Sequence, residues 1–253
     1  MSNTSDKTLR IEQSHRARTI SVVIPTLNEI TSIGATLDAV GRGFFEVIVA
    51  DGGSSDGTSE AARAWGARVI AAERGRGSQM HAGACAARGD IIWFLHADTR
   101  PPRDAAAQII EAFSNKDVVA GNFEIRFDGE SAAARFLSWL YPQLRRIGLC
   151  YGDSAVFVRR DVYERIGGFQ SFPIFEDLDL VRRLRKEGRI THLPASVTTS
   201  SRRFEGRSFA FTFARWATLQ TLYWIGVHPR RLVRLYAPIR AARLKPDKHK
   251  GLS

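Results

Sequence analysis

The sequence predicts an α/β protein built on a mostly parallel sheet. Four short apolar runs recur between residues 21 and 95, and stretches with helical spacing separate them. Strands and helices that alternate in this order are typical of parallel sheets with right-handed crossovers. The chain has 253 residues, of which 44% are hydrophobic and 25% charged, so it can bury a globular core without disulfides.

The first half of the chain accounts for four strands and three helices. The strands are expected at 21–25, 46–50, 67–71 and 91–95, and the fourth is apolar throughout, as in a strand buried on both faces. One helix is expected at 31–40, where Ile33, Leu37 and Val40 share a face. A second runs through Trp65 to a stop at Gly66, and a third runs from 75–77 to Gly89.

The second half continues the same sheet. We expect a helix ending near Phe113, a strand at 118–127, a helix at 131–147, a strand at 155–158, a helix at 176–187 and a strand around 190–197. The helix at 131–147 is amphipathic, with Phe136, Trp139 and Leu140 on its apolar side. No linker separates the halves. The expected organisation is a disordered leader at 1–18, one domain at 19–205 and a helical, basic extension at 206–253.

The net charge of +11 is concentrated at the C-terminal end. Residues 228–253 hold eight basic residues and one acid, a local charge of +7. Such a segment is either a solvated tail or the contact for an anionic partner, and the two interpretations are equally open. The anionic partners to consider are membrane headgroups, nucleic acid and phosphorylated ligands.

Two observations bear on the compartment. Residues 1–18 lack the apolar stretch of a secretory signal, and Cys85 and Cys150 are too sparse for a disulfide framework or a cysteine zinc site. Residues 209–227 are apolar but include Arg215, Gln220 and three threonines, so they do not read as a membrane span. We expect a cytoplasmic protein whose segment 209–227 either packs on the domain or lies at a membrane interface.

Polar groups follow each strand of the first half. Open parallel sheets bind ligands at the carboxyl ends of their strands, and these ends carry the segments 25–29, 51–56, 73–77 and 96–98. Each segment has a structural alternative: Asp56 can cap a helix, Arg74 and Arg76 can be solvated, and His96 can be a core histidine. Asp98 ends an apolar strand, where a divalent cation such as Mg²⁺ or Mn²⁺ would offset the cost of its charge.

The ordered motifs resemble the family 2 glycosyltransferases of GT-A fold. The matching segments are 23–29, 51–58, 84–89, 94–102, 152–153, 165–169 and 175–180. The second of them, Asp-Gly-Gly-Ser-Ser-Asp, is similar to the motif of a compact bacterial group. The resemblance implies a GT-A fold, with a Rossmann-like, mostly parallel sheet, flanking helices and a C-terminal helical extension.

The resemblance also implies a donor site for a nucleoside-diphosphate sugar. Its nucleoside pocket would be lined by Pro25, Thr26, Glu29 and Asp51, with UDP as the default nucleotide. Arg76 would approach the diphosphate, Asp153 would lie near the acceptor, and Arg202 and Arg203 would close over the diphosphate. Asp98 matches the last Asp of the family's Asp-x-Asp metal motif and would hold the metal, but His96 stands where the first Asp usually is. In the Asp-Gly-Gly-Ser turn, Gly52 replaces a second acid that is common in the wider family.

Asp177 matches the position of the family's general base, with Glu176 beside it. The implied reaction is an inverting transfer to a hydroxyl or carboxyl acceptor, which includes lipid-linked acceptors such as a polyprenyl phosphate. Two alternatives stay open: a nucleotidyltransferase of similar fold and a basic nucleic-acid-binding protein. A nucleotidyltransferase would usually carry a Gly-rich signature after the first strand, and this sequence has none there. A nucleic-acid-binding protein would leave Asp51, Asp98 and Asp177 without a role.

Overall fold

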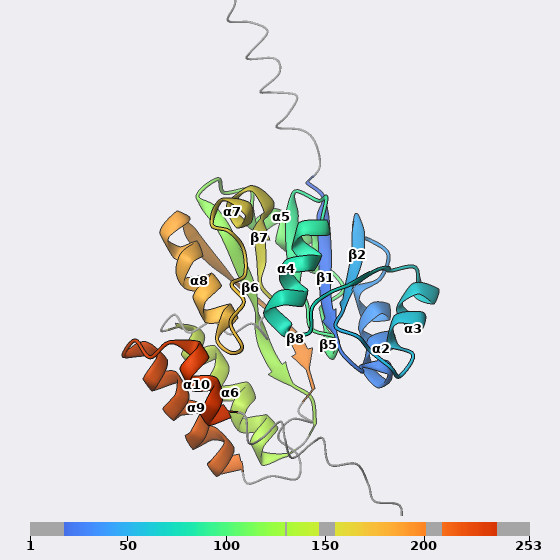
Figure 1. Ribbon diagram of the computed structural model, residues 1–253. Helices are drawn as coiled ribbons and strands as arrows, with labels where there is room; N and C mark the ends of the chain where they lie inside the picture. The colour runs from blue at the N-terminus through green and yellow to red at the C-terminus, as the bar shows by residue number, and fades with distance from the viewer. Residues whose placement is uncertain (1–17, 130, 147–154, 201–208, 237–253) are drawn as a thin grey trace, which may run out of the picture.

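The computed structural model describes residues 18–129, 131–146, 155–200 and 209–236 (Figure 1). Strands in these ranges are β1 (Ile20–Thr26), β2 (Glu46–Asp51), β3 (Arg68–Ala71), β4 (Ile91–Phe94), β5 (Thr99–Arg100), β6 (Val118–Phe127), β7 (Phe157–Arg159) and β8 (Arg189–Thr199). They form one eight-stranded sheet in the order β3-β2-β1-β4-β7-β6-β8-β5. The expected leader at 1–18, apart from Arg18, lies outside the described residues.

The first four strands form the predicted parallel half of the sheet. β1 pairs in parallel with β2 and with β4, and β2 pairs in parallel with β3. Strand β1 runs through Pro25 to Thr26, because these residues remain in register with Ala50 and Asp51 of β2. The strand ends therefore lie side by side, as a ligand-binding edge requires.

The other half of the sheet is mixed. β7 is antiparallel to both β4 and β6, whereas β6 and β8 are parallel. The two-residue strand β5, which the sequence did not predict, pairs antiparallel with the end of β8 at Thr99 and Thr199. This pairing places Asp98 at the point where β8 ends.

Helices cover both faces of the sheet. One face packs against α2 (Ile30–Val40), α3 (Thr58–Trp65) and α5 (Ala105–Ala112), and the other against α4 (Arg76–Ala86), α7 (Arg160–Arg165) and α8 (Glu176–Glu187). Alternation along β1 explains the two layers, because Val22 and Ile24 join the first cluster and Val23 joins the second. Helix α4 ends three residues before the predicted Gly89, because Ala87 is already extended.

Three helices form a further layer, which Figure 1 shows side by side at the α8 end of the molecule: α6 (Ala132–Arg146), α9 (Phe209–Trp224) and α10 (Pro229–Tyr236). Leu219 of α9 and Leu232 of α10 are buried against Phe175 and Leu178 at the start of α8. Of the two expectations for residues 209–227, packing on the domain therefore holds for Leu219 and its half-buried neighbours, whereas Trp224 and Ile225 are exposed.

The predicted apolar side of α6 was wrong. Ala134 and Leu137 are the buried residues, whereas Phe136 and Trp139 are 41% and 61% exposed. Spacing alone did not reveal this, because apolar side chains occur around most of the helix. Along the stretches that the structure describes, no helix has both the length and the apolarity needed to cross a bilayer.

Candidate active site

The ends of β1 and β2 are joined through their side chains. The Thr26 hydroxyl donates to Asp51 Oδ1 at 3.2 Å, and the Gly52 amide donates to the Thr26 carbonyl at 2.9 Å. Pro25, predicted for the same pocket, is buried within β1. The structure thus brings together Thr26 and Asp51 at the edge where the sequence placed a nucleoside.

Asp51 is held in its charged form. Partial burial would raise its pKa, but hydrogen bonds from the Ser54 hydroxyl and amide, and from the hydroxyls of Thr26 and Ser59, outweigh burial and lower it. Ser54 N–H donates to Asp51 Oδ2 at 3.0 Å. The carboxylate is thereby fixed as a hydrogen-bond acceptor at the end of β2.

The loops after β1 and β2 are linked residue to residue. Asn28, in a left-handed conformation at φ 55°, accepts the Ser55 amide at 2.9 Å, and the Glu29 amide donates to Thr58 Oγ1 at 2.9 Å. Asp56 accepts the first amides of two helices, Ile30 of α2 and Thr58 of α3, at 3.1 Å each. The predicted capping function of Asp56 therefore extends to α2, although Gly57 occupies the N-cap position of α3.

Helix α4 ties these loops to the other face of the sheet. Gln79 is 4% exposed, and its Nε2 donates to the carbonyl oxygens of Thr26 (2.6 Å) and Ala50 (2.9 Å). Its Oε1 accepts the Gly75 amide at 3.3 Å, just before the helix begins. Gly75 has φ 146°, which favours glycine at this turn.

The start of α4 meets the start of α8. The guanidinium of Arg76, the first residue of α4, contacts the Glu176 carboxylate, and its Nη2 lies 3.8 Å from Asp177 Oδ2. Glu176 and Asp177 are 2% and 7% exposed. The contact also needs a small residue after Arg76, because a Cβ at Gly77 would lie 3.2 Å from Glu176 Cβ. Arg76, predicted for the diphosphate, and the predicted pair Glu176 and Asp177 form one cluster.

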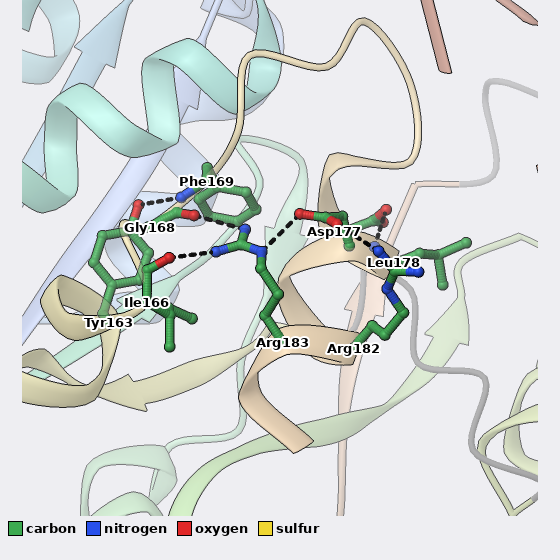
Figure 2. A network of polar contacts seen from close by, with 9 residues as sticks. Tyr163, Ile166, Gly168, Phe169, Asp177, Leu178, Arg182 and Arg183 are labelled. Carbon is green, nitrogen blue, oxygen red and sulfur yellow. Dashed lines mark hydrogen bonds and ion pairs between the residues drawn. The ribbon is translucent and has the colours of Figure 1, made fainter. Parts of the chain in front are cut away.

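A polar network supports the loop that leads into α8 (Figure 2). Arg183 donates to the carbonyl oxygens of Ile166 at 2.8 Å and Gly168 at 2.7 Å, and Tyr163 accepts the Phe169 amide at 3.0 Å. Arg183 also pairs with Asp179 one turn earlier, at 2.8 Å. Burial raises the pKa of the Tyr163 phenol, so the hydroxyl stays protonated. The Gly-Gly-Phe motif is thus a fixed turn.

The predicted metal residues lie in the segment between β4 and β5. His96 and Asp98 are half-buried, and Thr199 Oγ1 of β8 donates to Asp98 Oδ1 at 3.5 Å. The segment is held to α2, because Thr36 Oγ1 donates to the Ala97 carbonyl at 2.7 Å. Asp98 therefore lies beside Thr199, the last residue of β8.

Three of the predicted site residues lie outside the described residues: Asp153, Arg202 and Arg203. The supporting residues Gln79, Tyr163 and Arg183 were not singled out from the sequence. The spacing of Asp179 and Arg183 by four residues on a helix was a usable signal for an ion pair. Gln79 and Tyr163 gave no local signal, because their partners are 53 and 6 residues away and belong to other elements.

The fold and the arranged strand ends define a nucleotide-diphospho-sugar transferase fold of the GT-A class. A glucosyl-3-phosphoglycerate synthase from Mycobacterium tuberculosis, solved with Mn²⁺, UDP-glucose and phosphoglyceric acid, matches with a TM-score of 0.61. It is 23% identical, over 86% of this chain and 83% of that one, which shows the shared fold. The chain belongs to glycosyl transferase family 2, whose family model matches residues 21–166, more than half of its length.

Curated relatives are also glycosyltransferases. Glycosyltransferase AglE of Haloferax volcanii is 31% identical over 169 residues, 59% of this chain and 55% of the relative. A glucosyl-3-phosphoglycerate synthase of Mycolicibacterium paratuberculosis is 37% identical over 105 residues, 36% of this chain and 32% of the relative. The chain thus spans about half, or less, of the length of these relatives.

Proposed function

We propose that the protein is an inverting glycosyltransferase that moves a sugar from a nucleoside diphosphate to a hydroxyl or carboxyl acceptor. One observation carries the proposal: Arg76 Nη2 lies 3.8 Å from Asp177 Oδ2, at the meeting point of α4 and α8. Helix α4 is also bonded to Thr26 and Ala50 through Gln79. The proposed base, Asp177, and the proposed cation for the leaving diphosphate, Arg76, therefore lie together where α4 and α8 meet, beside the strand ends.

The proposed reaction is a single displacement. Asp177 takes the proton of the acceptor hydroxyl as its oxygen attacks the anomeric carbon. A bond from that carbon to the acceptor oxygen forms while the bond to the diphosphate oxygen breaks, which inverts the anomeric centre. A carboxylate acceptor attacks without this proton transfer. Arg76 stabilises the negative charge on the departing nucleoside diphosphate, and Glu176 orients Arg76 through their contact.

The residues at 96–98 fit a nucleotide-bound Mg²⁺ or Mn²⁺. No group of three or more His, Cys, Asp or Glu side chains that could hold an ion is found along the described chain. Such ions are commonly held by one or two carboxylates together with substrate phosphates, so Asp98 and, for Mn²⁺, the His96 imidazole suffice. When bound, the ion supplies charge neutralisation at the diphosphate.

UDP-glucose is the donor to test first. The mycobacterial synthase with the same fold was solved with Mn²⁺ and UDP-glucose. Asp51, ionised and fixed at the end of β2, would accept hydrogen bonds from the nucleobase. Asp153 is proposed to lie near the acceptor, and Arg202 and Arg203 are proposed to close over the diphosphate. The acceptor is proposed to be lipid-linked, with the enzyme acting as a peripheral membrane protein.

Thermal unfolding with a panel of nucleoside diphosphates, each with and without Mn²⁺, tests the donor site. A ligand at 100 times its Kd adds about 2.7 kcal/mol, or roughly 5–10 °C in Tm for a chain of this size. We expect UDP to give this shift with Mn²⁺ and Asp98→Ala to reduce it. Asp104→Ala, at the exposed N-cap position of α5, should leave the shift unchanged. An unchanged Tm with every nucleotide, with and without Mn²⁺, would contradict the proposal.

A further inference from the structure

The layer of α6, α9 and α10 has an unusual charge composition. These helices contain seven arginines (Arg135, Arg145, Arg146, Arg215, Arg230, Arg231 and Arg234) and neither aspartate nor glutamate. Among them, Arg135, Arg230 and Arg231 are exposed. Because these three neighbouring helices contribute arginines and no acids, the layer favours an anionic partner.

The same layer carries most of the large apolar side chains exposed in the described part of the chain. Of seven such residues, Phe136 and Trp139 lie on α6, and Trp224 and Ile225 lie at the end of α9, with exposures of 41%, 61%, 56% and 72%. The rings of Phe136 and Trp139 lie 5.9 Å apart. The other three (Ile30, Phe45 and Ile110) are scattered over the sheet domain.

Arginines stand near the exposed aromatic residues in the sequence. Arg135 precedes Phe136, and Trp224 and Ile225 are followed five to seven residues later by Arg230 and Arg231. Tryptophan at headgroup depth with arginine on lipid phosphates is the pattern of an interfacial helix. A protein partner would bury the apolar groups equally well, but anionic headgroups would in addition bind the exposed side chains of Arg230 and Arg231.

The layer is joined directly to the catalytic end of α8. Phe175, which precedes Glu176, stacks on Tyr223 of α9 with ring centroids 5.0 Å apart. Leu178 packs with Leu219 and Leu232. Any partner that binds this layer of helices therefore lies near the start of α8, which carries Asp177.

We propose that the α6, α9 and α10 layer docks on an anionic lipid bilayer, with Phe136, Trp139, Trp224 and Ile225 entering the headgroup region. The arginines bind the lipid phosphates. The consequence of docking rests on the proposed function: the bilayer would present lipid-linked acceptors to the acceptor side of the site. Binding to the bilayer needs neither donor nor turnover, so it is measured independently of activity.

The test is co-sedimentation of the full chain with phosphatidylcholine vesicles, with and without phosphatidylglycerol. We expect binding that requires phosphatidylglycerol and weakens between about 0.1 M and about 1 M salt. Arg230→Gln with Arg231→Gln should weaken it about 25-fold, since each arginine near an anionic surface contributes about fivefold. Trp139→Gln and Trp224→Gln should each weaken it about tenfold.

Matched controls come from the sheet domain. Phe45→Gln removes an apolar group as exposed as Trp224, at 56%, and Arg103→Gln removes an exposed arginine; both should bind like the parent. The proposal is overturned by no binding to anionic vesicles, by equal binding to phosphatidylcholine alone, or by an equal loss in the Phe45 variant. Salt-sensitive binding to duplex DNA or self-association through Trp139 and Trp224, in place of vesicle binding, also overturns it. Absence of vesicle binding by the parent protein, with UDP-sugar hydrolysis observed, would refute the docking surface and leave the proposed function standing.

Discussion

The guanidinium of Arg76 contacts the carboxylate of Glu176, which lies 100 positions further along the chain. Each is the first residue of a helix, α4 and α8, so the contact brings two helix N-termini together. A buried glutamate is costly without a charged partner, and Arg76 supplies one. The residue proposed to meet the diphosphate is thereby linked to the residue beside the proposed base.

Removing Arg76 should destabilise the protein more than removing the whole pair. Arg76→Gln leaves the buried Glu176 without its cation, which we expect to cost about 2 kcal/mol. Adding Glu176→Gln removes the buried charge and should restore about half of the loss. Urea unfolding of both single variants and the double variant measures this coupling. Strictly additive effects would show that the two side chains do not interact.

The contact between α4 and α8 also depends on Gly77. An added Cβ would lie 3.2 Å from Glu176 Cβ and 3.3 Å from the Gln170 carbonyl oxygen, so we expect Gly77→Ala to cost about 1 kcal/mol. Gly34→Ala, at an exposed position of α2, is the control, because no atom lies within 4 Å of its added Cβ. That change should stabilise the helix by about 0.5–1 kcal/mol. Equal thermal shifts in the two variants would contradict the close packing.

Asp51 should make stability depend on acid pH. Its pKa is lowered in the folded protein, so its contribution is present above the unfolded pKa and is lost as the pH falls through the folded pKa. We expect Asp51→Asn to cost about 1 kcal/mol at pH 7 and progressively less below about pH 4. Urea unfolding at several pH values measures the difference, with exposed Asp104→Asn as the control. A difference that stays constant with pH would count against this explanation.

Tyr163 should act on the site through the loop that it supports. Tyr163→Phe removes the oxygen that accepts the Phe169 amide at 3.0 Å and contacts His81 Nδ1 at 3.1 Å. A buried amide without its acceptor costs about 1–3 kcal/mol, and we expect faster amide exchange at Phe169. Hydrogen exchange of residues 166–175 measures this directly. Unchanged exchange would show that the phenol does not hold the turn.

The sequence predicted the parallel half of the sheet well because its signals are local. Apolar strands, glycine stops and polar strand ends follow one another along residues 20–98. β1, β2 and β3 pair with their neighbours in the chain, and β4 joins the other edge of β1, as right-handed crossovers predict. The family resemblance predicted Arg76, Glu176 and Asp177 as site residues, but not the contact of Arg76 with Glu176. That contact needs the crossing of two helices, which no local pattern contains.

Other features depended on long-range packing. Strand β5 has two residues and exists only because Thr199 pairs with Thr99. On α6, the predicted apolar side carried Phe136 and Trp139, but packing against β6 and α9 buries Ala134 and Leu137 and half-buries Tyr141 and Leu144 instead. Gln79 was missed for the same reason, since its hydrogen bonds reach two strand ends that only the fold brings to it.

The release of nucleoside diphosphate from a panel of nucleotide sugars, UDP-glucose first, in the presence of Mn²⁺ tests the central claim most directly. The parent protein should release UDP, and Asp177→Asn should slow release at least about 100-fold, since the general base is lost, while UDP still raises the Tm of the variant. Asp161→Asn, on the exposed face of α7, should release UDP at the parent rate. Equal rates in the Asp177 variant and the parent, or no release from any donor, would contradict the account.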